Sequence, residues 1–481
     1  MALCFERDTL SWLELSRSLD RLAAWIAARI PPGRGVALHL PNGPAFALLF
    51  FATARAGREA QVLDPAWPAS SLDATLVTLA PSLIVTTDPR LAKQPGTVLL
   101  RDAAMPFREV ADAIGAPVRF TAPPQPDARL PFYVGFTSGS TGQAKGYRRN
   151  HRSWFESFRA DAAEFGIQAS DAVLAPGTLT HSLFLYAMAN GLHAGASVVF
   201  CRGFRPATLP RLIGEHGVTV LYGVPTHLRL IADAALSAGA APMASVRWVL
   251  SSGAKWFADG KHDLKRLFPA SRFAEFYGAS ELSFVTVARD DEPVPENSVG
   301  RAFPGVSLTI RDRRGRRLPP GRTGRVFVES PLVFSGYAVG GEGDLYLAGA
   351  ALSVGDMGTM DADGFLYLAG REKRMIVTSG KNLFPEEIER VLERHGAVAA
   401  AAVLGVPDAK RGERLVALVL FRGEARVQRA SLIAHARRAL PLYKVPRLYG
   451  AVAEWPRTPS GKSDFGALRG LWQAGNCERL L

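Results

Sequence analysis

Cysteine is scarce in this chain, which has three in 481 residues. Cys4, Cys201 and Cys477 lie far apart, so their spacing predicts neither a disulfide framework nor a metal cluster. Such thiols fit a reducing compartment. The first ten residues, MALCFERDTL, carry acids early and no apolar core of signal-peptide length. The sequence therefore predicts a cytoplasmic protein.

Long apolar runs are also missing. The two longest, residues 45–54 and 397–406, reach about half the length that a helix needs to cross a bilayer. Internal repeats and low-complexity segments are absent as well, apart from a Pro-rich connector at 121–131. We therefore predict no membrane span.

Lysine is unusually rare among the basic residues. Only ten of the 57 are lysines, and Lys145, Lys373, Lys381 and Lys462 fall in Gly-rich or turn-rich stretches. The formal net charge is +13, and from Arg371 to the end 20 Lys and Arg face 11 Asp and Glu. This balance is compatible with an acidic partner such as nucleic acid. A solvated, Arg-rich surface without a partner explains it equally well.

The length predicts two or more domains, and 48% hydrophobic with 21% charged residues is typical of a globular enzyme. Short apolar runs alternate with helical periodicity up to about residue 280, which predicts parallel sheets. The expected strands are 35–40, 59–64, 81–87, 172–177, 196–200, 218–224, 246–252 and 272–278. The expected helices include 10–30 with Ser11 as N-cap, 43–57, 69–80, one from about 151, and 182–194.

From about residue 300 the pattern changes to short β segments with turns, as in 307–330 and 358–370. After Gly370 a compact basic unit follows. We therefore predict an α/β fold in which a large N-terminal domain (1–370) has doubly wound, mostly parallel sheets and a β-rich subdomain. A small C-terminal α+β domain (371–481) follows on a hinge.

Residues 136–146 read FTSGSTGQAKG, directly after an apolar segment. Such a run is either a flexible surface loop or a phosphate-binding loop whose backbone N–H groups curl around an anion. A Walker P-loop is disfavoured, because Gln143 follows Gly142 and Lys145 lacks an adjoining Ser or Thr. The run lies beyond the carboxyl end of a predicted strand, where such sheets bind ligands.

Five ordered motifs carry a resemblance to a known family. They are FTSGSTGQAKG (136–146), APGTLTHSLF (175–184), YGASE (277–281), GDMGTMDADGFLYLAGRE (355–372) and PRTPSGK (456–462). In this order and separation the chain resembles the adenylate-forming (AMP-binding) superfamily, and looks acyl-CoA synthetase-like. The resemblance covers residues 130–465 and favours a phosphate-binding role for the first motif.

By this resemblance the first motif closes over the β- and γ-phosphates of ATP, the third lines the adenine pocket, and Asp356 with Arg371 holds the ribose. Ser280 stands where the family usually has threonine, which preserves the hydroxyl. The implied ATP-binding residues are Thr137, Ser138, Gly139, Ser140, Thr141, Gly142, Lys145, Tyr277, Gly278, Ala279, Ser280, Asp356 and Arg371.

The resemblance also implies four catalytic residues: Lys462, Glu281, Thr141 and His181. Glu281 matches the family's magnesium-binding glutamate, a hard ligand for a hard cation. Lys462 matches the lysine that bridges the substrate carboxylate and the α-phosphate, where negative charge develops. Lys373 stands at the hinge position.

His181 matches the residue that lines the acyl pocket, although a lone histidine beside apolar residues is also typical of a core. Ser182 stands where members that activate amino acids place an aspartate, and a buried ammonium without a counter-charge is unfavourable. We therefore expect a non-amino-acid substrate, aryl or fatty. The expected acyl pocket consists of His181, Ser182, Tyr222, Ser252, Gly253 and Ala254.

The resemblance implies two half-reactions, with ATP, Mg²⁺ and coenzyme A as cofactors. A carboxylate and ATP give acyl-AMP and pyrophosphate, and a thiol then displaces AMP. An acidic acyl carrier protein with its phosphopantetheine is the alternative acceptor, since opposite charge would attract it to the basic C-terminal domain. We expect no nucleic-acid partner, and a non-catalytic nucleic-acid-binding protein that retains the fold is the remaining alternative.

Overall fold

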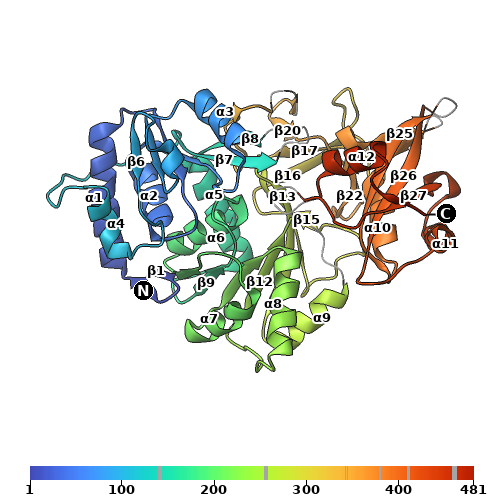
Figure 1. The fold of residues 1–481 in the computed structure, drawn as a ribbon, viewed down its shortest axis with the longest axis horizontal. Coiled ribbons are helices and arrows are strands. Elements are labelled where there is room, and N and C mark those ends of the chain that lie inside the picture. Colours follow the sequence, from blue (N-terminus) through green and yellow to red (C-terminus); the bar gives the residue numbers. More distant parts are fainter. Residues whose placement is uncertain are drawn as a thin grey trace. The chain divides into compact units, whose positions relative to one another are not determined.

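The computed structural model describes residues 1–138, 144–253, 258–341, 343, 345–378, 381–408, 412–457 and 463–480 (Figure 1). The chain divides into two compact units. The first takes in 1–137, 144–308 and 328–342, and the second takes in 309–327 and 343–481. Sheets of nine, seven, six and six strands confirm the predicted α/β class. Across the described ranges, every helix is too short or too polar to traverse a lipid bilayer.

A seven-stranded sheet in the first unit has the order β18-β8-β7-β4-β3-β5-β6. Its strands are β3 (Gly35–His39), β4 (Glu59–Val62), β5 (Leu83–Thr86), β6 (Thr97–Leu99), β7 (Pro131–Ser138), β8 (Ala144–Asn150) and β18 (Tyr337–Val339). The pairs β3–β4, β3–β5, β4–β7 and β5–β6 are parallel. β3, β4 and β5 are buried along their whole length, as is typical of parallel strands covered on both faces.

The three predicted helices of this region are present, and a short fourth helix, α4, is not predicted. The four helices are α1 (Trp12–Arg29), α2 (Pro44–Arg55), α3 (Ala69–Leu79) and α4 (Val110–Ala113). The predicted N-cap of α1 is confirmed: the Ser11 hydroxyl accepts from the Glu14 backbone N–H, and the Glu14 carboxylate accepts from the Ser11 N–H in return.

A nine-stranded sheet completes the first unit, in the order β15-β14-β13-β12-β11-β9-β10-β1-β2. Its strands are β1 (Leu3–Phe5), β2 (Asp8–Leu10), β9 (Ala172–Ala175), β10 (Ser197–Phe200), β11 (Val220–Gly223), β12 (Trp248–Ser252), β13 (Arg272–Ala279), β14 (Ser283–Arg289) and β15 (Arg301–Ala302). The helices along this part of the chain are α5 (His151–Phe165), α6 (Ser182–His193), α7 (Leu209–Glu215), α8 (Pro225–Ser237) and α9 (Ala258–Leu267). β9 to β13 run parallel, so their carboxyl ends meet at one edge, where such sheets bind ligands.

The sequence pattern does not predict the strand β8 or the pairing of β1 with β10. The apolar pattern does not predict β8, because its sequence AKGYRRN carries three cations. Nor does it predict that β1 joins the distant β10 in parallel, with Leu3 opposite Val198. In both cases the tertiary partner decides the strand, since β propensity depends strongly on context.

The second unit contains two six-stranded sheets. One is formed by β16 (Ser307–Arg311), β17 (Gly324–Glu329), β19 (Tyr346–Ala348), β20 (Ala351–Ser353), β21 (Asp356–Met360) and β22 (Leu366–Arg371). The other is formed by β23 (Ile376–Thr378), β24 (Lys381–Leu383), β25 (Val398–Asp408), β26 (Gly412–Phe421), β27 (Leu448–Ala451) and β28 (Glu478–Arg479), with helices α10 (Pro385–Glu393), α11 (Arg429–Ala439) and α12 (Phe465–Gln473). The β-rich segment thus clusters with the C-terminal part, and a domain boundary between 370 and 371 stays a prediction.

A buried acid joins three elements of the first unit. Asp161 on α5 is fully buried, with Oδ1 accepting from Asn190 Nδ2 (2.9 Å) and Oδ2 from the Tyr222 hydroxyl (3.2 Å). Burial raises the pKa of the Asp161 carboxyl to about 7, against the smaller lowering effect of these two hydrogen bonds. The protonated side chain is therefore the form that the fold favours.

This acid makes stability depend on pH. Its folded-state pKa lies above the unfolded value, so its stabilising contribution is complete below about pH 4 and is lost as the pH rises toward 7. Asp161→Asn keeps the shape without the titration. Relative to the variant, the wild type is expected to lose up to about 1.4 kcal/mol of unfolding free energy per pH unit in this window. Urea unfolding of both proteins between about pH 4 and 8 measures this, and parallel profiles would contradict it.

Candidate active site

The YGASE segment (277–281) forms the end of β13 and the turn into β14, at the carboxyl edge of the nine-stranded sheet. The two strands shift register at Gly278, and a Cβ built on Gly278 would lie 2.2 Å from the Ser283 carbonyl oxygen. Only glycine permits this close approach. The turn that follows presents Ser280 and Glu281 beyond the strand ends.

The Glu281 side chain is held from a strand far along the chain. Tyr337 on β18 donates its hydroxyl to Glu281 Oε1 (2.8 Å), and the Phe334 N–H donates to the Glu281 carbonyl oxygen (2.8 Å). A buried carboxylate fixed in this way is a suitable hard ligand for Mg²⁺. No three His, Cys, Asp or Glu cluster as metal ligands within the described residues. Mg²⁺ is commonly held by one or two carboxylates together with substrate phosphates and water, so a single glutamate is compatible with such a site.

The strands β7 and β8 flank the predicted phosphate loop. Thr137 lies near the end of β7 and Lys145 near the start of β8. The backbone of Ser138 is described, whereas the predicted residues Gly139, Ser140, Thr141 and Gly142 lie outside the described residues. On β18, Tyr337 stands opposite Tyr147 of β8. Through Tyr337, β18 therefore connects the strand that carries Lys145 with Glu281.

A pair of hydroxyl groups joins the predicted acyl and ATP regions. Ser182 begins α6, and its Oγ lies 3.3 Å from Ser280 Oγ. His181 directly precedes α6, and its backbone N–H donates to the Thr178 carbonyl (3.0 Å). The structure therefore brings together residues that come from motifs about one hundred positions apart in sequence.

The other predicted acyl-pocket residues lie near the carboxyl ends of β11 and β12. Ser252 Oγ donates to a backbone carbonyl of β13 (2.9 Å), and Gly253 has a φ of +93°, a conformation that favours glycine. Tyr222 is fully buried and its hydroxyl donates to Asp161, so it would support a pocket from behind and not contact the substrate with its hydroxyl. Ala254 lies outside the described residues.

In the second unit, Asp356 on β21 and Arg371 on β22 are register partners. Arg371 Nε lies 3.1 Å from Asp356 Oδ1, and the aspartate is buried while the arginine is exposed. A carboxylate acceptor and a cationic donor, the two chemistries predicted for the ribose, therefore stand side by side.

Lys373 lies between two sets of ion pairs. It is the middle residue of the 3-10 turn Glu372–Arg374. The Glu372 carboxylate accepts from Arg325 of β17 (2.8 and 2.9 Å), and Arg374 pairs with two glutamates of α10 (3.0 and 2.6 Å). The predicted hinge position is thus flanked by residues anchored to different elements.

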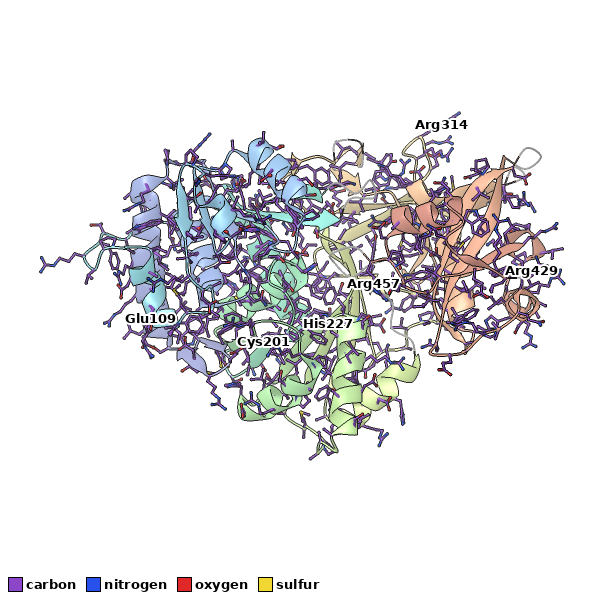
Figure 2. All side chains as sticks on the ribbon, in the orientation of Figure 1. Glu109, Cys201, His227, Arg314, Arg429 and Arg457 are labelled. Carbon is purple, nitrogen blue, oxygen red and sulfur yellow. The ribbon has the colours of Figure 1, made fainter. Side chains whose placement is uncertain are left out.

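Lys462 lies outside the described residues, and the described residues that flank 458–462 pair with each other. Arg457, labelled in Figure 2, forms an antiparallel bridge with Ser463, whose Oγ accepts from the Trp455 indole N–H (2.9 Å).

Comparison with known proteins decides the family. Residues 1–338 match the family model described as AMP-binding enzyme, and residues 387–462 match that of the AMP-binding enzyme C-terminal domain. The chain belongs to the AMP-binding enzyme family. This confirms the resemblance that the five motifs carry.

Two relatives of this AMP-binding enzyme match it along nearly its whole length. The uncharacterized acyl-CoA ligase YhfT of Bacillus subtilis (strain 168) is 37% identical over 466 residues, covering 96% of this chain and 93% of that protein. A feruloyl-CoA synthase of an Amycolatopsis species is 30% identical over 469 residues, with the same two coverages of 96% and 93%. The solved structure of ATP-bound MatB from Rhodopseudomonas palustris has a TM-score of 0.87 at 26% identity and covers 98% of this chain and 95% of its own.

Tyr337 is one of the described contacts at the candidate site that the motifs do not single out. It lies outside all five motifs, and a tyrosine after Gly336 in a short β segment is a weak signal. The individual roles of the predicted site residues stay predictions.

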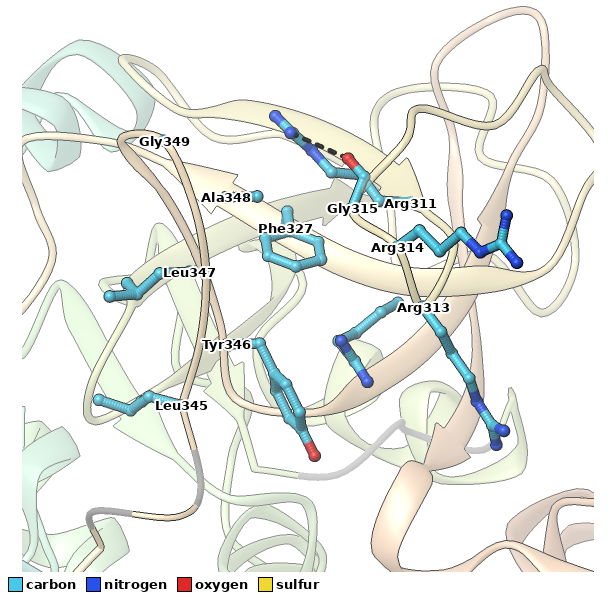
Figure 3. A pocket seen from close by; sticks show the side chains of 11 residues that line it. Arg311, Arg313, Arg314, Gly315, Phe327, Leu345, Tyr346, Leu347, Ala348 and Gly349 are labelled. Atoms are coloured by element: carbon cyan, nitrogen blue, oxygen red, sulfur yellow. Dashed lines mark hydrogen bonds between the residues drawn. The ribbon is translucent and has the colours of Figure 1, made fainter.

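A cavity of about 770 Å³ lies elsewhere, in the second unit (Figure 3). It is lined by Arg311, Arg313, Arg314, Gly315, Arg325, Phe327 and residues 345–349. Arg325 stacks over the Tyr346 ring (3.6 Å), and Arg311 donates to the Gly315 carbonyl (3.3 Å). None of the predicted site residues lines this cavity, so it is not part of the candidate active site.

Proposed function

We propose that this AMP-binding enzyme uses ATP to activate a carboxylic acid as acyl-AMP and then transfers the acyl group to the thiol of coenzyme A. The proposal rests above all on the match to both family models combined with acyl-CoA ligase relatives that cover 96% of the chain. The edge of the nine-stranded sheet supports it, since Glu281, Ser280 and Ser182 gather there.

In the first half-reaction, a carboxylate oxygen bonds to the α-phosphorus of ATP, the bond to the β-phosphate oxygen breaks, and pyrophosphate leaves. Lys145 and the 137–142 loop would offset the charge of the leaving phosphates, and Asp356 would orient the ribose. Glu281 would hold Mg²⁺, which when bound would further shield the phosphate charge. Lys462 would lie between the attacking and α-phosphate oxygens.

In the second half-reaction, the thiol sulfur bonds to the acyl carbon, the mixed-anhydride C–O bond breaks, AMP leaves, and the thiol proton is released. His181 would border the path of the thiol. We propose that the C-terminal part turns at Lys373 between the two steps.

The acid is proposed to be aryl or fatty rather than an amino acid. The Ser182–Ser280 hydroxyl pair is neutral and cannot balance a substrate ammonium. A feruloyl-CoA synthase and a long-chain-fatty-acid–CoA ligase of Bacillus subtilis, 30% and 31% identical, are consistent with either class.

A carrier protein is the second candidate acceptor. Arg437 and Arg438 are exposed at the end of α11, within the basic C-terminal part, where an acidic partner would be attracted. A cytoplasmic location is proposed with either acceptor.

One experiment tests the function and the acceptor together. We expect pyrophosphate release from ATP with at least one acid of a panel of aryl, fatty, dicarboxylic and amino acids, and thioester formation when coenzyme A is added. Parallel reactions with a holo carrier protein distinguish the second acceptor. ATP turnover that no acid stimulates would overturn the proposal.

A further inference from the structure

Arg149 on β8 is buried beside the YGASE turn, with only 3% of its surface exposed. Its Nη1 donates to the Ser280 carbonyl (3.2 Å), and its Nη2 donates to the Leu332 carbonyl (2.7 Å). Nε donates to the Ser153 hydroxyl (3.1 Å), and Nη2 also reaches the Ser153 carbonyl (3.4 Å). Each of these acceptors is neutral.

The carbonyl acceptors Ser280 and Leu332 lie on the two chain segments that hold Glu281. Ser280 immediately precedes Glu281, and Leu332 begins the stretch whose Phe334 N–H and Tyr337 hydroxyl both bind Glu281. One planar guanidinium therefore joins the two segments that position the carboxylate. A lysine ammonium could not span both carbonyls in this way, because it lacks the rigid fork of arginine.

The charges of Arg149 and Glu281 also favour this arrangement. Burial lowers the pKa of the Arg149 guanidinium to about 10, while the nearby tyrosines and the Glu281 carboxylate act in the opposite sense. Arg149 and Glu281 are thus within electrostatic range of each other. Their opposite charges attract each other, which adds to the hydrogen bonds that join the two segments.

We propose that Arg149 is a positioning residue for magnesium–ATP binding: it holds the Ser280 and Leu332 carbonyls so that Glu281 keeps its place. The inference rests on the proposed function. Burial alone does not distinguish Arg149, because Arg58 is also buried (8% exposed) and donates to the carbonyls of Ile30 and Ala56 (2.6 Å each). The position beside Glu281 distinguishes it.

Arg58 therefore provides the matched control. Arg149→Lys, Arg149→Met and Arg58→Lys are compared with the wild type in thermal stability and in Mn²⁺ binding with α,β-methylene-ATP, followed by the electron paramagnetic resonance of free Mn²⁺. We expect Arg149→Lys to weaken Mn²⁺ binding about tenfold, the effect typical of residues that support a metal ligand. Arg58→Lys is expected to lose stability only.

Activity provides a second readout. With an acid from the panel, Arg149→Lys should raise the Mg²⁺ concentration for half-maximal ATP–pyrophosphate exchange about tenfold, while conversion of supplied acyl-AMP to thioester stays within about twofold. A profile that matches Arg58→Lys, or equal loss of both half-reactions, would overturn the role of Arg149. A wild type without acid-dependent exchange would instead overturn the proposed function, and the inference with it.

Discussion

Lys462→Ala is expected to lower acid-dependent ATP–pyrophosphate exchange by about 10²–10³-fold, the loss typical of removing one group that stabilises developing charge. Both the attacking carboxylate and the α-phosphate oxygens are negative in the transition state, and one ammonium between them offsets that charge. Conversion of supplied acyl-AMP to thioester should persist, because that step has no incoming carboxylate. Exchange and thioester assays on the same preparation measure the two steps separately.

Lys444→Ala is the control for this prediction. Lys444 also lies in the C-terminal part, but it pairs with Glu387 of α10 (2.6 Å), so its loss should affect stability and leave exchange nearly unchanged. If Lys462→Ala reduced both half-reactions equally, or neither, the assigned role would be wrong.

Glu281→Gln is expected to reduce exchange by about 100-fold at a fixed Mg²⁺ concentration, because a neutral amide is a much weaker ligand for a hard cation. Glutamine keeps an oxygen that can accept the Tyr337 hydroxyl, so the fold around it should persist. The measurement is the exchange rate as a function of Mg²⁺, and added Mg²⁺ should recover part of the activity.

Two further variants, one milder change at the same site and one control, test this interpretation. Tyr337→Phe removes the hydroxyl at 2.8 Å without changing the carboxylate, and a milder loss of about tenfold is expected. Glu164→Gln breaks an ion pair with Arg289 (3.1 Å) in the same unit and should leave the Mg²⁺ dependence unchanged. An unaltered Mg²⁺ dependence in Glu281→Gln would exclude this residue as the metal ligand.

Much of the framework could be predicted from the sequence. Strands such as β3, β9 and β12 are short apolar runs between helices, and buried parallel strands require that pattern. The motifs also indicate which strand ends carry polar groups, because parallel strands end at one edge. Ser182 and Ser280 meet there, as two motifs assigned to one site should.

The supporting contacts could not be predicted in the same way. Arg149 reaches Leu332, and Glu281 reaches Tyr337, through strands that are polar or only three residues long. No local periodicity encodes such pairings, since they depend on how distant segments pack. The same limit explains why the sequence misses the pairing of β1 with β10.

The ion pairs around Lys373 have a mechanical consequence. Glu372 is paired with Arg325 of β17, and Arg374 is paired with two glutamates of α10. A backbone rotation that extended beyond Lys373 would therefore break one of these ion pairs. β22 and α10 are also joined directly, because the Arg371 N–H donates to Glu386 Oε1 (3.4 Å) and Arg390 Nη2 donates to the Leu368 carbonyl (3.3 Å). If the C-terminal part turns at Lys373, as proposed, it therefore has to break the direct contacts between β22 and α10 and replace them with others.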